Sequence, residues 1–158
     1  MIKTEAIILK SDNFGEVDRV LTIYAKEFGK ICVVAKGAKK LESKLRYHLE
    51  PLSYSYLILI GGKSLRIVKD AVLIDQFLSI RNNLKKIKTA QNITELLDEL
   101  IVGEEQDENI WNLLIKSLKI INTKDNLSDN STMISNFKNT LIELLGYSPE
   151  HTNLQNIY

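Results

Sequence analysis

Hydrophobic and polar residues alternate with a period of two through much of the first half of the chain. The clearest run extends from Asp18 to Lys36 and is divided by a turn at Gly29. This period is typical of strands that place one face on a core and the other toward solvent, as in the wall of a barrel. The two alternating sets are Val20, Thr22 and Tyr24 against Leu21, Ile23 and Ala25, followed by Ile31, Val33 and Ala35 against Lys30, Cys32, Val34 and Lys36.

The same pattern predicts five short strands. They are expected at Thr4–Ser11, Asp18–Ala25, Lys30–Lys36, Ser53–Ile60 and Ser64–Asp75. Gly61 and Gly62 are expected to close the last two strands as a tight hairpin, because glycine adopts the positive φ angles of two-residue turns. The longest gap separates the third strand from the fourth. This arrangement matches the oligonucleotide- and oligosaccharide-binding (OB) fold, although other small barrels have similar patterns.

After Asp75 the period changes to that of a helix. Apolar residues recur every three or four positions in three segments, near residues 84–101, 110–121 and 134–145, which predicts three amphipathic helices. Asp107 and Ser131 stand where N-caps are expected, since their side chains can accept hydrogen bonds from free backbone N–H groups. The predicted fold class is α+β, with a five-stranded OB-fold β-barrel at residues 1–78 followed by an α-helical domain at residues 79–158.

Basic residues are concentrated in the predicted barrel. The net charge of the chain is +1, but the segment from Lys26 to Arg46 contains seven basic residues against two glutamates, a local excess of +5. Such a segment suits the phosphates of a nucleic acid, and nearby tyrosines offer stacking surfaces for bases; a merely solvated loop is the alternative. The candidate nucleic-acid-binding residues are Lys26, Lys30, Lys36, Lys39, Lys40, Lys44, Arg46, Tyr24 and Tyr47. Arg19 either pairs with a neighbouring carboxylate or joins this set.

The sequence contains no arrangement that is typical of an enzyme active site. Gly62-Lys63-Ser64 resembles the end of a phosphate-binding P-loop, but Leu57 stands where that motif needs its first glycine. The single cysteine, Cys32, has no demonstrable histidine partner, and the two histidines lack the spacing of a metal pair. We therefore expect no catalytic residues, no metal site and no cofactor.

The chain also has no charged leader with an apolar stretch, and no apolar run approaches the roughly 20 residues of a membrane span. The expectation from sequence is a cytoplasmic protein with no membrane partner.

Several segments resemble the RecO family of bacterial recombination mediators. They are Asn13–Arg19 (NFGEVDR), Lys26–Lys30 (KEFGK) and Val34–Lys40 (VAKGAKK). Leu49–Leu52 (LEPL) and Leu144–Pro149 (LLGYSP) follow in the order of that family, so the resemblance covers nearly the whole chain.

This resemblance implies an OB-fold domain, a helical domain and a non-enzymatic role in recombinational DNA repair. It implies binding to single- and double-stranded DNA, annealing of complementary strands, and assistance to RecA on strands coated by single-strand-binding protein. RecR and the tail of single-strand-binding protein are the implied protein partners. Two alternatives stay open, namely an OB-fold RNA-binding factor and a protein-interaction adaptor that uses the helical domain.

The chain departs from the family in one respect. Many members carry a four-cysteine zinc module soon after the Gly-Tyr-x-Pro motif, whereas residues 151–158 contain no cysteine. We expect a short or truncated form without that module, and zinc is not predicted. In the helical domain, Lys116 and Lys119 flank an apolar stripe and are the expected docking residues for an acidic tail peptide, against the alternative of a solvated helix face.

Overall fold

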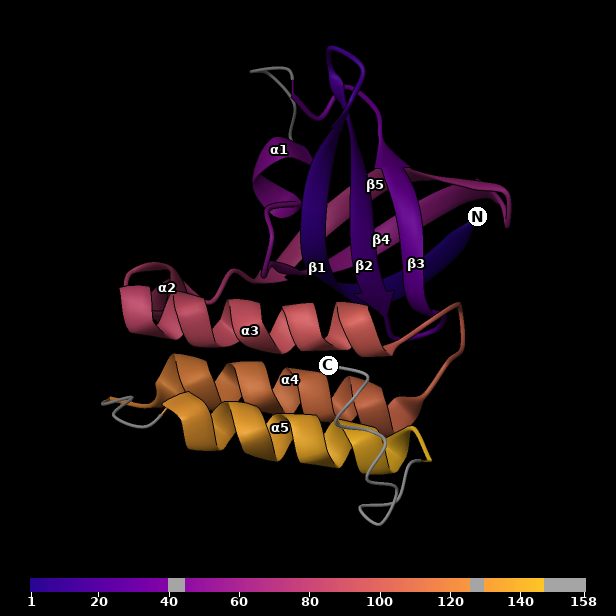
Figure 1. Cartoon of the computed structure of the whole chain (residues 1–158). Helices are drawn as coiled ribbons and strands as arrows, with labels where there is room; N and C mark the ends of the chain where they lie inside the picture. Colours follow the sequence, from indigo (N-terminus) through magenta and orange to yellow (C-terminus); the bar gives the residue numbers. More distant parts are fainter. Residues whose placement is uncertain (40–44, 126–129, 147–158) are drawn as a thin grey trace.

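A closed barrel of five strands forms the N-terminal half of the molecule (Figure 1). The computed structural model describes residues 1–39, 45–125 and 130–146, apart from the side chains of Arg46 and Tyr47. The strands are β1 (Ile2–Phe14), β2 (Asp18–Ala25), β3 (Gly29–Ala35), β4 (Tyr54–Gly62) and β5 (Leu65–Asp75). Their order around the barrel is β1-β2-β3-β5-β4, and only β3 and β5 pair in parallel. The predicted fold class is confirmed.

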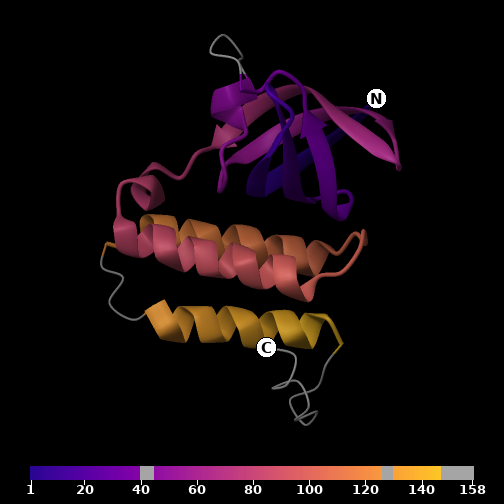
Figure 2. The same cartoon turned by 45° about the horizontal axis from the view of Figure 1, so that its top comes forward.

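The helices that come after the barrel strands lie on one side of the barrel. These are α2 (Leu78–Arg81), α3 (Leu84–Leu100), α4 (Glu108–Thr123) and α5 (Asn130–Leu144), whereas a short α1 (Leu45–His48) lies between β3 and β4. Helices α3 and α4 lie next to the barrel, and α5 packs on their far side (Figures 1 and 2). The three long helices match the three segments of helical period in the sequence.

Two hydrophobic cores hold this arrangement together. The first fills the barrel and includes the inward set of the alternating run: Leu21, Ile23, Ala25, Ile31, Val33 and Ala35. The second joins the helices to the outer surface of the barrel, where Ile7, Tyr24 and Tyr54 pack with Trp111 and Leu114. Much of the outer barrel surface near the helices is therefore buried rather than solvated.

Two local expectations were wrong. The turn between β4 and β5 consists of Lys63 and Ser64, because Gly62 pairs with Leu65 and Gly61 pairs with Arg66. Ser131 lies within α5 rather than at its cap, since that helix already includes Asn130. Asp107 is the N-cap of α4, and its side chain accepts a hydrogen bond from the Ile110 backbone N–H at 3.1 Å.

Candidate nucleic-acid interface

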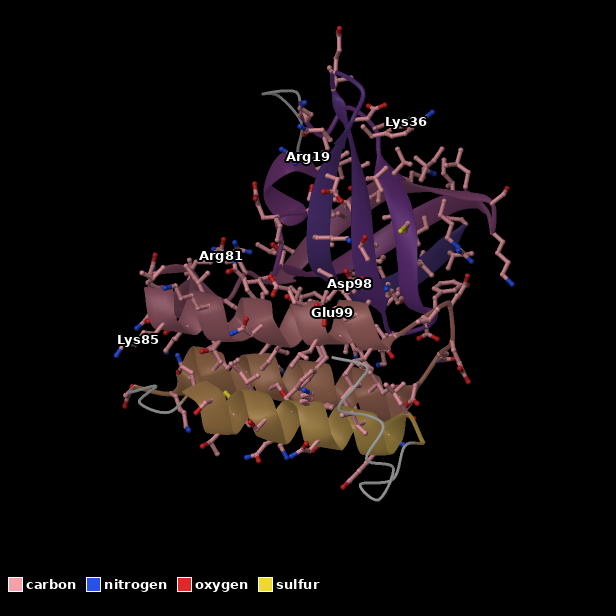
Figure 3. All side chains as sticks on the ribbon, in the orientation of Figure 1. Arg19, Lys36, Arg81, Lys85, Asp98 and Glu99 are labelled. Atoms are coloured by element: carbon pink, nitrogen blue, oxygen red, sulfur yellow. The ribbon has the colours of Figure 1, made fainter. Side chains whose placement is uncertain are left out.

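The basic residues of the Lys26–Arg46 segment separate to opposite ends of the barrel. Lys26 and Lys30 flank the β2–β3 hairpin, at the end that contacts the helices. Lys36 follows β3 at the other end, away from the helices (Figure 3), and Lys39 lines a hollow at that end together with Arg19. Lys40 and Lys44, and the side chains of Arg46 and Tyr47, lie outside the described residues.

Lys30 contacts the C-terminal end of α3 rather than solvent. Its Nζ donates to the backbone oxygens of Asp98 at 2.6 Å and Ile101 at 2.9 Å, and lies 2.9 Å from the Asp98 carboxylate. A cation here is favourable because the last carbonyl groups of a helix lack partners within the helix and carry partial negative charge. These three contacts match the three N–H donors of an ammonium group. Lys30 therefore joins the barrel to the C-terminal end of α3.

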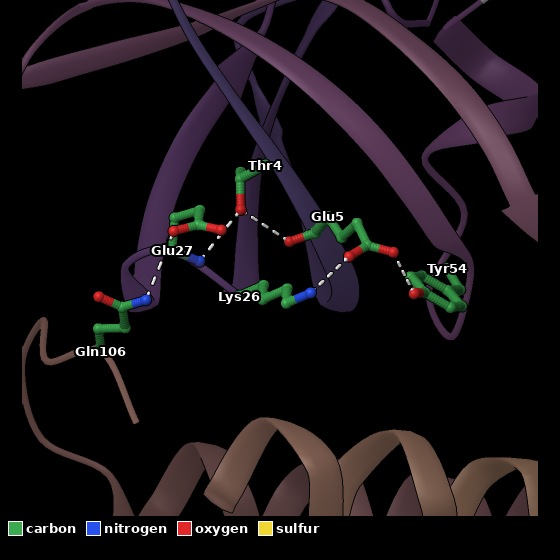
Figure 4. A network of polar contacts seen from close by, with 6 residues as sticks. All are labelled: Thr4, Glu5, Lys26, Glu27, Tyr54 and Gln106. Atoms are coloured by element: carbon green, nitrogen blue, oxygen red, sulfur yellow. Dashed lines mark hydrogen bonds and ion pairs between the residues drawn. The ribbon is translucent and has the colours of Figure 1, made fainter. Parts of the chain in front are cut away.

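Lys26 belongs to a polar network on the same end of the barrel (Figure 4). Its Nζ lies 3.2 Å from a carboxylate oxygen of Glu5, and the other oxygen accepts a hydrogen bond from the Tyr54 hydroxyl. The Tyr54 hydrogen bond is the main reason that the pKa of Glu5 lies below its usual value; burial opposes this effect and Lys26 adds to it. A phosphate bound at Lys26 would compete with this existing ion pair.

Tyr24 has no ring face available to a base. Only 1% of the residue is exposed, and its ring stacks on that of Trp111 in α4 with centroids 6.4 Å apart. Tyr54 meets Trp111 edge to face at 5.8 Å. The placement of Tyr24 therefore corrects the expectation that it stacks on nucleic acid: the helices cover the strand face that carries it.

The other end of the barrel brings two sequence motifs into contact. The Asp18 carboxylate accepts a hydrogen bond from the Gly37 N–H at 2.6 Å, and the Lys39 N–H donates to the Val17 backbone oxygen at 2.9 Å. The β1–β2 hairpin and the turn after β3 are thereby fixed to each other. Gly37 has a positive φ of 68°, a conformation that glycine adopts without steric cost.

Arg19 is a candidate that the sequence could not assign. Its guanidinium donates to the Ser11 hydroxyl at 3.2 Å and forms no ion pair with a described carboxylate. It lines a hollow of about 470 Å³ at the mouth of the barrel, together with Lys39 and Glu50. Asp18 and Arg19 are successive residues of β2, and successive side chains of a strand point to opposite faces, so the sequence could have excluded an ion pair between them.

Lys36 and Lys39 remain available to an anion. Lys36 is exposed and Lys39 is half-buried. Within the described ranges, the ion pairs involve Lys10, Lys26, Lys30 and Arg66, and neither Lys36 nor Lys39 takes part. Together with Arg19, they place three basic side chains at this end of the barrel, where Glu50 lines the same hollow as Arg19 and Lys39. We call these three residues the Arg19–Lys39 surface and define it by Arg19, Lys36 and Lys39.

The two lysines proposed for peptide docking point to different surroundings. Lys116 lines a hollow of about 470 Å³ between α4 and α5, together with Ile120, Lys124 and Phe137. Lys119 instead lies close enough to Glu5 to help lower the pKa of that carboxyl. The structure therefore joins Lys116 with Lys124, rather than with Lys119, beside an apolar surface.

Within residues 1–39, 45–125 and 130–146, no group of three or more His, Cys, Asp or Glu side chains is arranged to hold a metal ion. None of the helices in the described part has both the length and the apolar character needed to cross a membrane.

Comparisons with known proteins give consistent matches. The family profile described as "Recombination protein O N terminal" matches residues 1–77. The DNA repair protein RecO of Dehalococcoides mccartyi is 34% identical over 148 residues, which are 94% of this chain and 57% of that protein. The DNA repair protein RecO of Desulforamulus reducens is 32% identical over 151 residues, which are 96% of this chain and 57% of that protein. The chain thus spans less than two thirds of the length of these relatives.

Proposed function

Because this chain belongs to the RecO family of DNA repair proteins, we propose that it is a non-enzymatic, cytoplasmic DNA-binding mediator of recombinational repair. In this proposal it binds single- and double-stranded DNA, anneals complementary strands and assists the loading of RecA onto coated single strands. The observation that carries the proposal is the Arg19–Lys39 surface, where cationic side chains without described carboxylate partners gather on one end of an OB-type barrel.

This surface suits annealing because annealing is limited by repulsion between phosphates. Lysine and arginine replace condensed counterions on each strand, which lowers the repulsion and gains the entropy of ion release. Lysine is adequate for this task, since a point charge follows a phosphate backbone without requiring bidentate geometry. No nucleophile, general base or cofactor is needed.

The helical half is proposed to bind proteins rather than DNA. Residues 81–158 carry 8 basic and 11 acidic side chains, a net charge of −3, which repels phosphate. The hollow between α4 and α5 offers Ile120 and Phe137 for an apolar anchor, and Lys116 and Lys124 for a carboxylate, which suits the acidic tail of single-strand-binding protein. In a titration with that tail peptide, Lys116→Glu should weaken binding more than Lys119→Glu; equal effects would contradict this location. RecR remains a proposed partner without an assigned surface.

A salt titration tests the DNA-binding role. The triple variant Lys36→Gln, Lys39→Gln, Lys40→Gln should bind single-stranded oligonucleotides of any sequence more weakly. The slope of log affinity against log salt should become shallower by up to about 2, because each lost phosphate contact contributes about 0.7 on single strands. Fluorescence anisotropy over a range of salt concentrations measures both quantities.

The matched control removes the same charge elsewhere. Lys63, Lys69 and Lys85 are exposed and lie outside the Arg19–Lys39 surface, so replacing these three by glutamine should leave the slope nearly unchanged. Equal effects of the two triple variants would show that Lys36, Lys39 and Lys40 are not part of the interface. A preference of the wild-type protein for structured RNA over single-stranded DNA would contradict the proposed substrate.

A further inference from the structure

The β1–β2 hairpin extends beyond the barrel core and presents an aromatic ring to solvent. Phe14 is the last residue of β1, pairs with Asp18 and is 54% exposed. Residues 12–17 around it are exposed as well. A phenylalanine in this position leaves a large apolar area in water, and its ring is available to a partner that stacks on it.

The end of the β1–β2 hairpin is hydrogen-bonded to the turn after β3, which carries Lys36 and Lys39. Asp18, the strand partner of Phe14, accepts the Gly37 N–H, and Val17 accepts the Lys39 N–H. The Phe14 ring and the two lysines therefore belong to segments that are held together rather than to independent loops. This preorganisation lowers the entropy lost when one ligand contacts both.

Charges on the hairpin restrict which part of a nucleotide can meet the ring. Asp12 and Glu16 are exposed acidic residues on either side of Phe14. They repel phosphate near the hairpin, whereas Lys36 and Lys39 attract it to the adjoining turn. A strand held by its phosphates on the lysine turn can therefore direct a base, but not its backbone, toward the ring.

We propose that Phe14 stacks on an unpaired base of single-stranded DNA whose phosphates lie on the Arg19–Lys39 surface. This inference rests on the proposed DNA-binding function and adds a preference for single strands. The face of a base is free for an aromatic ring in a single strand but is covered by neighbouring base pairs in a duplex. Phe14 thereby contributes binding free energy that depends on whether the DNA is single- or double-stranded, and not on charge.

The test compares Phe14→Ala, Phe14→Leu and Phe14→Trp in binding to an oligothymidine and to a duplex of equal length. Phe14→Ala and Phe14→Leu should bind the oligothymidine between about 5-fold and about 150-fold more weakly, the range that corresponds to one lost base–aromatic stack. Their salt slope should stay unchanged because no charge is removed, and duplex binding should stay unchanged. Phe14→Trp should retain affinity, and its emission should be quenched by the oligothymidine but not by the duplex.

Leu65→Ala is the matched control, since Leu65 is a 53% exposed apolar residue on the separate β4–β5 hairpin. It should leave oligothymidine binding unchanged. Wild-type affinity in Phe14→Ala, or full affinity in Phe14→Leu, would overturn the stacking role. If the triple lysine variant weakens binding while Phe14→Ala does not, only the stacking fails. If neither variant changes binding, the interface in the proposed function fails as well.

Discussion

At the scale of single residues, Gly29 shows how the absence of a side chain sets the distance between barrel and helices. It begins β3 with a positive φ of 77°, and a Cβ added to it would lie 2.2 Å from the backbone oxygen of Glu105 in the loop before α4. Gly15 has a similar φ of 71°, but an added Cβ there meets no atom within 4 Å. Both positions therefore require a positive φ angle, but only at Gly29 does another backbone segment lie where a Cβ would stand.

This difference predicts the relative stability of two variants. Gly15→Ala should lower the free energy of unfolding by about 1–2 kcal/mol, the cost of placing a Cβ in the left-handed region. Gly29→Ala should lower it by clearly more, because the loop before α4 must also move away from the barrel. Urea denaturation of both variants measures the losses, and equal losses would show that the approach of Glu105 does not constrain the hairpin.

At the scale of secondary-structure elements, Lys86 connects three helices. It lies in the first turn of α3 and is only 4% exposed, and its Nζ donates to the Ser79 hydroxyl of α2 at 2.7 Å and the Asn122 backbone oxygen of α4 at 3.1 Å. Asn122 belongs to the last turn of α4, whose carbonyl groups have no partner within the helix. A buried lysine here satisfies one of them and complements the helix dipole.

Replacing Lys86 should therefore destabilise the helical half. Lys86→Met keeps most of the apolar length but leaves the partly buried Asn122 oxygen without this donor, so we expect a loss of about 1–3 kcal/mol. The neighbouring Lys85 is exposed (Figure 3), and Lys85→Met should change stability by less than about 0.5 kcal/mol. Thermal and urea unfolding compare the pair; a Lys86→Met protein as stable as Lys85→Met would refute this role.

At the scale of the whole molecule, one carboxylate of α3 ties the helices to two strands. Asp98 lies 2.9 Å from Lys30 of β3 and 3.2 Å from Lys10 of β1. Burial disfavours its charged form, but hydrogen bonds from Lys30 and Lys10 outweigh this effect and hold the pKa of Asp98 below the usual value of 3.8. Glu5 behaves in the same way from a usual pKa of 4.5, for the reasons given above.

These lowered pKa values predict acid sensitivity of the barrel–helix contact. A carboxylate whose pKa is lower in the folded state stabilises that state above its unfolded pKa, and this stabilisation is lost as pH falls through the folded pKa. Asp98→Asn should thus be less stable at neutral pH and lose less stability than wild type between about pH 5 and about pH 2. The neighbouring Glu99 is exposed and takes part in none of the ion pairs of the described residues.

Glu99→Gln is accordingly the control, with a pH profile parallel to that of the wild type. The free energy of unfolding, measured by urea titration at several pH values, gives these profiles. A parallel profile for Asp98→Asn as well would show that Asp98 does not contribute to the acid response.

Local periodicity along the chain is enough to predict both types of secondary structure and the fold class. Alternation with a period of two and recurrence every three or four residues are local properties, because a strand exposes alternate side chains and a helix repeats every 3.6 residues. The alternating set from Leu21 to Ala35 that faces the barrel interior follows from the strand period, and Trp111 falls on the helical stripe of residues 110–121 that packs into the core. The basic turn could also be found in this way, since Lys36 and Lys39 are close in sequence and in space.

Which outward residues reach solvent, and which basic residues lie together, depends on how the barrel and the helices pack in three dimensions. Lys30 and Lys36 are six residues apart, but β3 separates them by about 20 Å at 3.3 Å per residue, so one meets α3 and the other meets solvent. Tyr24 and Phe14 both lie on barrel strands, yet α4 covers Tyr24 and leaves Phe14 exposed. No local pattern distinguishes such residues, because their exposure depends on where elements distant in the sequence pack.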